Sequence, residues 1–230
     1  MKRSLFVVAI DGPAGAGKSI TARLVAERLG FVYVDTGALY RALTLQVLRR
    51  KIPLDDTAGI EKLALESRFD LRNDNGRQEV VLDGDDVTEE IRLPEVTNSI
   101  GPISALPRVR EVLVQRQREI ARHSSAPGVV MEGRDIGTVV FPDADVKIFM
   151  LASIDVRTQR RHAELAARGV VSHVEQLREE MLRRDAQDMN RAAGALRRAE
   201  DAVDLDTTGL SIDEQVNFII NVVQQRTCSS

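Results

Sequence analysis

The chain of 230 residues contains a single cysteine, Cys228, near its C-terminal end. One cysteine excludes a disulfide within the chain and a cysteine-based metal cluster. The lack of disulfides fits a reducing compartment. We therefore expect the protein to be cytoplasmic.

A long hydrophobic run is also missing. Residues 1–4 lead into the apolar stretch 5–10, which is too short to span a membrane and has no signal-peptide cleavage pattern. The length, with 43% hydrophobic and 29% charged residues, is typical of one α/β domain with an insert or of two small domains. We expect a single domain over residues 1–230, a monomer, and no membrane partner.

The sequence has no excess of basic charge. Its net charge is −3 and its pI is near 5.7, which argues against a general nucleic-acid binder. Lysine is rare, because only five of the 32 basic residues are lysines and the rest are arginines. Arginine suits bidentate phosphate binding, although genomic base composition produces the same bias.

Residues 12–19 have the pattern G-x-x-x-x-G-K-S, which is typical of a phosphate-binding loop. In such a loop the backbone N–H groups surround an anion, Lys18 reaches the outer phosphates, and the Ser19 hydroxyl binds Mg²⁺. A plain glycine-rich turn is the alternative. The buried-strand pattern before the loop and the helical spacing after it favour the phosphate site. The predicted ATP-binding residues are Gly12, Pro13, Ala14, Gly15, Ala16, Gly17, Lys18, Ser19 and Ile20.

The rest of the chain alternates between predicted strands and helices. This order indicates an α/β fold with a parallel sheet and right-handed crossovers. Thr36 is a plausible N-cap of the second helix. Further strands are predicted at 31–35, 129–131, 146–151 and 202–206, and further helices at 60–66, 107–123, from about 154, at 174–191 and at 212–223.

The middle of the chain has a different pattern. Two strand-like runs, 68–71 and 79–82, flank Asn73-Asp74-Asn75-Gly76, and Asn-Gly in this position predicts a hairpin. We expect a small antiparallel insert over residues 69–88. Helical segments should follow, interrupted at Pro94 and Pro102.

Polar residues follow the predicted strands, where open α/β sheets bind ligands. Asp35 and Glu132 are placed to hold Mg²⁺ through water. The alternative for either carboxylate is a helix cap or a buried ion pair.

Two arginine arrays are predicted on helix faces. Arg157 and Arg161 are four residues apart, with Arg160 beside them, and Arg184, Asp188 and Arg191 share another face. Such an array is either a solvated row of salt bridges or, facing a phosphate loop, a clamp for a transferring phosphoryl group.

Several motifs resemble the bacterial cytidylate kinases, of the nucleoside monophosphate kinase superfamily. The resemblance extends from residue 5 to about 210, and its most specific stretch is Gly-Arg-Asp-Ile-Gly-Thr-Val-Val-Phe-Pro-Asp-Ala at 133–144. The other matching stretches are residues 10–18, 35–41, 107–110, 184–191 and 205–208.

This resemblance implies a P-loop fold with a five-stranded parallel sheet, a CMP-binding insert at about 66–105 and a lid at about 155–172. It implies transfer of the ATP γ-phosphoryl group to CMP or dCMP, with Mg²⁺ as cofactor. It also implies binding roles. The CMP phosphate would be held by Arg41, Arg134 and Arg191, near Thr36. Cytosine would be read by Arg110 and Asp135. The sugar would be held by Arg184 and Asp188, and the lid would contain Arg157 and Arg161. The residues expected to act in catalysis are Lys18, Arg134, Arg157, Arg161 and Arg191.

The sequence departs from the family pattern at two places. A family serine that helps to bind the base falls on Gly101, next to Pro102, so base recognition is expected to be looser. Ala195-Leu196 replaces Pro-Leu, which leaves the shape of that loop open. A related kinase with another acceptor, such as UMP, is the alternative. A GTP-binding switch would need an Asn-Lys-x-Asp motif, which the sequence lacks.

Overall fold

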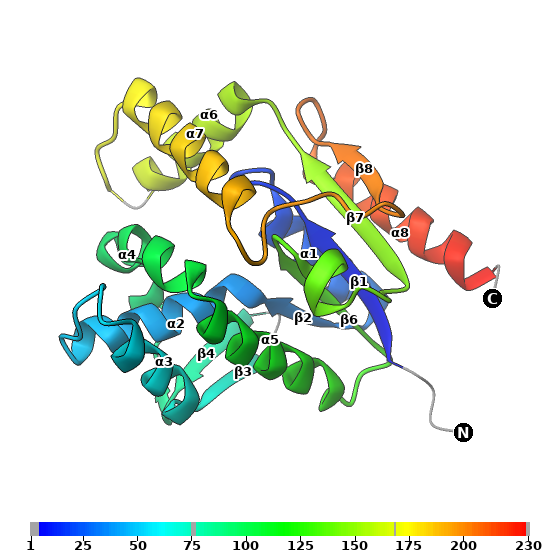
Figure 1. The fold of residues 1–230 in the computed structure, drawn as a ribbon. Coiled ribbons are helices and arrows are strands. Elements are labelled where there is room, and N and C mark those ends of the chain that lie inside the picture. Colours follow the sequence, from blue (N-terminus) through cyan, green and yellow to red (C-terminus); the bar gives the residue numbers. More distant parts are fainter. Residues whose placement is uncertain (1–4, 75–76, 168, 229–230) are drawn as a thin grey trace.

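The computed structural model describes residues 5–74, 77–167 and 169–228. Its centre is a five-stranded parallel sheet, as the sequence predicts, and the strand order in it is β2-β6-β1-β7-β8 (Figure 1). The strands are β1 (Phe6–Asp11), β2 (Val32–Asp35), β6 (Gly128–Gly133), β7 (Val146–Leu151) and β8 (Val203–Asp206).

Helices cover both faces of this sheet. They are α1 (Lys18–Leu29), α2 (Thr36–Arg49), α3 (Thr57–Glu66), α4 (Pro94–Ala105), α5 (Pro107–Arg122), α6 (Ile154–Ala167), α7 (Val174–Asn190) and α8 (Ile212–Cys228). Figure 1 shows α6 and α7 on one side of the carboxyl edge of the sheet and α2 to α5 on the other.

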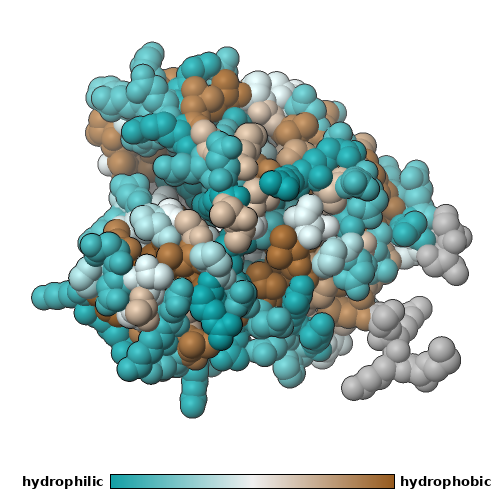
Figure 2. Space-filling model, viewed as in Figure 1, coloured by the Kyte–Doolittle hydropathy of each residue, from teal (hydrophilic) through white to brown (hydrophobic). Residues whose placement is uncertain are grey.

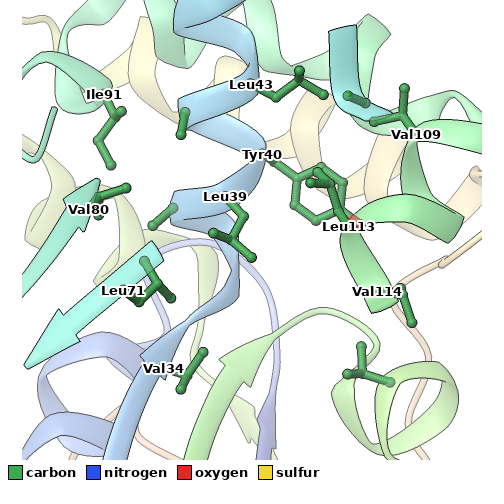
Figure 3. Close-up of a cluster of buried hydrophobic side chains, with 14 of the residues drawn as sticks. Val34, Leu39, Tyr40, Leu43, Leu71, Val80, Ile91, Val109, Leu113 and Val114 are labelled. Atoms are coloured by element: carbon green, nitrogen blue, oxygen red, sulfur yellow. The ribbon is translucent and has the colours of Figure 1, made fainter. Parts of the chain in front are cut away.

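The two faces of β1 belong to two separate hydrophobic clusters. Val7 and Ala9 join a large cluster with α2, α3 and α5, whereas Val8 and Ile10 pack with α1 and α8. This alternation follows from the period of two in a strand. Figure 3 shows the first cluster, with Leu39 and Leu43 of α2 among side chains of the small sheet and α5.

A three-stranded antiparallel sheet forms the predicted insert. Its strands are β3 (Phe69–Asp74), β4 (Arg77–Leu82) and β5 (Asp85–Asp86), in that order. Asn75 and Gly76 of the predicted turn lie outside the described residues. The Gln78 side chain ties this sheet to the edge strand β2, because its amide accepts from Asp35 N (3.0 Å) and donates to Tyr33 O (2.6 Å).

Two local predictions are wrong. Asp35, not Thr36, caps α2, because its carboxylate accepts from Ala38 N at 3.1 Å while Thr36 is already the first helical residue. Helix α4 is not interrupted at Pro102 but continues to Ala105. A proline removes one hydrogen-bond donor, and the rest of this 12-residue helix tolerates that loss.

Two short helical turns were not predicted. They are a 3₁₀ turn, η1 (Glu90–Arg92), and a π-helical turn, η2 (Ile136–Val140), which follows β6. Among the described residues, no helix is both long enough and apolar enough to cross a membrane.

Candidate active site

The phosphate-binding loop follows β1 at the carboxyl edge of the sheet. Gly12 has a φ of 154°, and a Cβ there would overlap the Met150 carbonyl oxygen. Gly17 has a φ of 94°, in the left-handed region, and precedes α1 directly. Glycine is therefore needed at both positions, so that the loop can turn from the strand into the helix.

Side chains from distant segments hold the backbone of this loop. Thr207 Oγ1 donates to Ala16 O at 2.9 Å, and Arg157 Nη1 donates to Ala14 O at 3.1 Å. Both bonds fix carbonyl groups, which leaves the loop's N–H groups as the anion-binding side. The sequence did not reveal this support, because the bonds join residues 143 and 191 positions apart.

Lys18 is buried within the loop and its Nζ donates to Pro13 O at 2.9 Å. The pKa of Lys18 is lowered to about 7, mainly by burial and then by the charge of Arg134, while Glu132 and Asp11 oppose the shift. An ammonium group that is this poorly compensated has a strong attraction for a polyanion.

A cleft of about 1100 Å³ opens beside the loop and lies between α4 and the pair α6 and α7. Figure 2 shows the molecule hollowed between these two parts. The predicted site residues that line it are Ala14, Gly15, Gly17, Lys18, Ser19, Ile20, Asp35, Arg41, Gly101, Arg161, Arg184 and Arg191. The cleft lining does not include Gly12, Pro13, Ala16, Thr36, Arg110, Glu132, Arg134, Asp135, Arg157 or Asp188.

The array on α7 is not a solvated row of salt bridges. Asp188 is only 2% exposed, and its carboxylate contacts Arg134 Nε at 2.8 Å and Arg191 Nη2 at 2.6 Å. Burial acts to raise the pKa of Asp188, but the charges of Arg134 and Arg191 outweigh it and hold this pKa below its ordinary value. The carboxylate therefore stays ionised and organises two arginines.

Arg184 lies in the same positive cluster. Burial lowers its pKa to about 10, and the charges of Arg134, Arg41 and Arg191 contribute to the shift. Asp188 and Asp35 are the carboxylates paired with these arginines. Four arginines and two carboxylates leave a net positive charge, which suits a phosphate dianion.

Arg110 and Asp135 form a buried ion pair. The Arg110 guanidinium also lies 5.5 Å from the centroid of the Tyr40 ring, and a Cβ at Gly194 would overlap this guanidinium. Burial raises the pKa of Asp135 despite the nearby Arg110 charge.

Gly101, on α4, leaves room on its side of the cleft, because a Cβ there would be 3.9 Å from Gln187 Oε1.

Asp35 and Glu132 are neighbours in the register of β2 and β6. Asp35 combines the helix cap with a 2.5 Å ion pair to Arg41, so it has the structural role that the sequence left open. Glu132 accepts a 2.6 Å hydrogen bond from Tyr33 OH. Burial, and then the charge of Asp35, raises the pKa of Glu132.

The predicted lid arginines have different surroundings. Arg157 is buried, contacts Asp185 at 2.8 Å and donates to the loop carbonyl described above. Arg161 lines the cleft and pairs with Glu164 at 2.9 Å. Arg160 also lines the cleft and donates to Thr207 O at 2.7 Å. Arg157 thus supports the phosphate loop from outside the cleft.

Three residues of this region were missed as functional candidates: Asp11, Tyr33 and Gln78. Tyr33 reaches Glu132, and Gln78 reaches the backbone of β2. The sequence does place Asp11 at the end of a strand next to the phosphate loop, where ligands and their supports gather, but it assigns no role to it. Nothing in the sequence singled out the other two.

Known proteins match this chain over almost its whole length. A family model described as "Cytidylate kinase" matches residues 8–225. A cytidylate kinase of Geobacillus sp. (strain WCH70) is 48% identical over 219 residues, which cover 95% of this chain and 96% of that protein. A cytidylate kinase of Geobacillus kaustophilus (strain HTA426) is 47% identical over 226 residues, which cover 98% of this chain and 99% of that protein.

Proposed function

The chain belongs to the cytidylate kinase family, and on that premise we propose that it transfers the γ-phosphoryl group of ATP to CMP or dCMP. The products are ADP and CDP or dCDP, so the protein is an enzyme, a nucleoside monophosphate kinase. The observation that carries the proposal is the arginine cluster beside the phosphate loop. Phosphoryl transfer requires two polyanions to be held in line while their repulsion is screened.

The phosphate loop is the proposed ATP site. Its N–H groups and the N-terminus of α1 would hold the β- and γ-phosphates, with Lys18 at the transferred group. Because Lys18 is buried with little compensation, charge that develops on the γ-phosphoryl group would be stabilised strongly. Residues 12–20 therefore form the donor half of the site.

The arginine cluster is the proposed site of the acceptor phosphate. Arg41, Arg134 and Arg191 would contact its oxygens, and Thr36, at the start of α2, would lie near them. Arg184 and Asp188 would bind the sugar hydroxyls. Arg134 and Arg191 already share the Asp188 carboxylate, so the acceptor would meet preoriented guanidinium groups.

Cytosine would be bound by Arg110 and Asp135. A carboxylate accepts from the N4 amino group, and a guanidinium donates to N3 and O2. These two side chains are paired with each other in the structure, so the base would have to replace part of that pair. Gly101 offers no side chain to the base.

The donor set near the loop fits a magnesium ion. Ser19, Asp35 and Glu132 offer hydroxyl and carboxylate oxygens, the ligands that Mg²⁺ prefers. We infer that Ser19 would bind the ion directly and the two carboxylates through water. Bound with ATP, the ion would screen the phosphate charge.

Water must be excluded during transfer, because hydrolysis of ATP is the competing reaction. We infer that the insert at about 66–105 and the lid at about 155–172 close over the substrates. Arg157 and Arg161 belong to this lid, and Arg161 already lines the cleft. We also infer that the enzyme acts as a monomer in the cytoplasm.

A coupled ADP-release assay tests the function directly. The purified protein, ATP and Mg²⁺ are combined in turn with CMP, dCMP, UMP, AMP and GMP. We expect rapid ADP release with CMP or dCMP and roughly a hundredfold lower kcat/KM with UMP. Preference for UMP would indicate a related kinase with another acceptor, and ADP release that no acceptor increases would reject the proposal.

A further inference from the structure

Asp11 connects two parts of the site without contacting the cleft. It ends β1, is 5% exposed, and immediately precedes the phosphate loop. Its Oδ1 accepts from Ile136 N at 2.8 Å, and its Oδ2 accepts from Gly137 N at 2.8 Å. Both carboxylate oxygens are thus committed to a segment that lies more than 120 residues away in the sequence.

The two N–H groups belong to the first residues of η2. The first N–H groups of a helical turn have no partner within it, so a side chain must supply one. The residues just before them are Arg134 and Asp135, whose side chains contact Asp188 and Arg110. The backbone position of both side chains therefore depends on the turn that Asp11 holds.

Within the described ranges, no salt bridge to Asp11 is formed, although Lys18 exerts an attractive charge on it and Asp135 a repulsive one. The nearby Lys147 directs its Nζ to Pro142 O and Asp201 instead. A buried carboxylate without an ion pair is costly, and the hydrogen bonds from Ile136 N and Gly137 N are what compensates this one.

We propose that Asp11 is a positioning residue that sets the acceptor-binding turn against the phosphate loop. It would hold Arg134 and Asp135 at the right distance from the donor phosphates, because a single carboxylate attached to the loop fixes both N–H groups of the turn. This inference rests on the proposed function, since it assigns Arg134 and Asp135 to the acceptor.

The test is the isosteric variant Asp11→Asn. An amide has one acceptor oxygen and one NH₂ group, so one of the two backbone N–H groups loses its partner and faces a donor. Asp145→Asn is the control at an exposed position, because Asp145 Oδ2 accepts from Val7 N at 2.7 Å near the opposite end of β1. Both variants thus lose a carboxylate that binds backbone N–H groups beside the same strand.

The measurements are KM for CMP, KM for ATP and the ratio of kcat/KM for CMP to that for UMP. We expect Asp11→Asn to raise KM for CMP roughly tenfold and to lower the CMP-to-UMP ratio, with KM for ATP within about threefold of wild type. Asp145→Asn should change none of the three by more than about twofold. The wild-type rate with CMP, measured in the same assay, tests the proposed function separately.

Two results would overturn the inference. The first is a change that does not single out the acceptor, which is either an equal rise of both KM values or a loss of thermal stability with unchanged kinetic constants and an unchanged ratio. The second is a failure to fold. If Asp11→Asn does not fold, Asp11→Ser, which keeps one acceptor in a smaller side chain, is measured instead, and failure of both to fold would mean that Asp11 serves stability alone.

Discussion

Asp188 offers the sharpest test of how the acceptor site is organised, and the change we choose is Asp188→Asn. The carboxylate is 2% exposed and is shared by Arg134 and Arg191, whose side chains are 20% and 14% exposed. Removing one partner of a buried ion pair costs about 3–5 kcal/mol, because the other charge remains buried. An asparagine keeps one acceptor, so we expect a loss of about 3 kcal/mol in the free energy of unfolding.

This loss is large enough to measure by thermal unfolding. For a chain of this length, each kcal/mol corresponds to about 2–4 °C, so Tm should fall by roughly 6–12 °C. Asp213→Asn is the control, since the Arg28–Asp213 pair has a similar N–O distance of 2.7 Å but side chains that are 42% and 78% exposed. An exposed pair contributes about 1 kcal/mol or less, and Tm should fall by less than about 4 °C.

Two further measurements separate the acceptor site from general stability. Inorganic phosphate should raise Tm of Asp188→Asn more than that of wild type, because the anion replaces the missing charge beside the arginines. KM for CMP should rise much more than KM for ATP. A Tm within about 2 °C of wild type, or equal changes in both KM values, would refute the view that Asp188 organises this cluster.

Three other predictions concern the phosphate loop, the base and pH. Lys18→Ala should lower kcat at least a hundredfold with an unchanged circular dichroism spectrum, because one contact to developing charge is typically worth about 3 kcal/mol; retention of more than about a tenth of kcat would contradict this. Asp135→Asn should reduce the preference for CMP over UMP, since an amide can donate to the uracil carbonyl, and an unchanged ratio of kcat/KM would exclude Asp135 as a base-binding residue. Burial raises the pKa of Asp11 from 3.8 to about 6, so its contribution to stability is present below about pH 4 and is lost as pH rises through 6. Over that range the free energy of unfolding of Asp11→Asn should rise relative to wild type by roughly 3 kcal/mol, as followed by urea unfolding at several pH values, and a difference independent of pH would contradict the shift.

Much of the fold could be predicted from local patterns. The five strands of the parallel sheet are short apolar runs, and β3 and β4 have a turn signal between them. Such patterns depend on neighbours a few residues away, which the sequence displays directly. The strand order and the continuation of α4 through Pro102 depend on packing between distant segments, and no local pattern encodes that packing.

By itself, the sequence determined the phosphate loop, the residue types of the acceptor site and membership in the family, because these depend on which residues occur at which spacing. Only the tertiary structure decided which partners they have. Arg157 donates to a carbonyl group of the phosphate loop, Asp188 is buried between two arginines instead of lying in a solvated row of salt bridges, and Asp11 binds a turn 125 residues away. These contacts follow from the meeting of parallel strands and their loops at one edge of the sheet, where side chains remote in sequence compensate one another's charges and unsatisfied backbone groups.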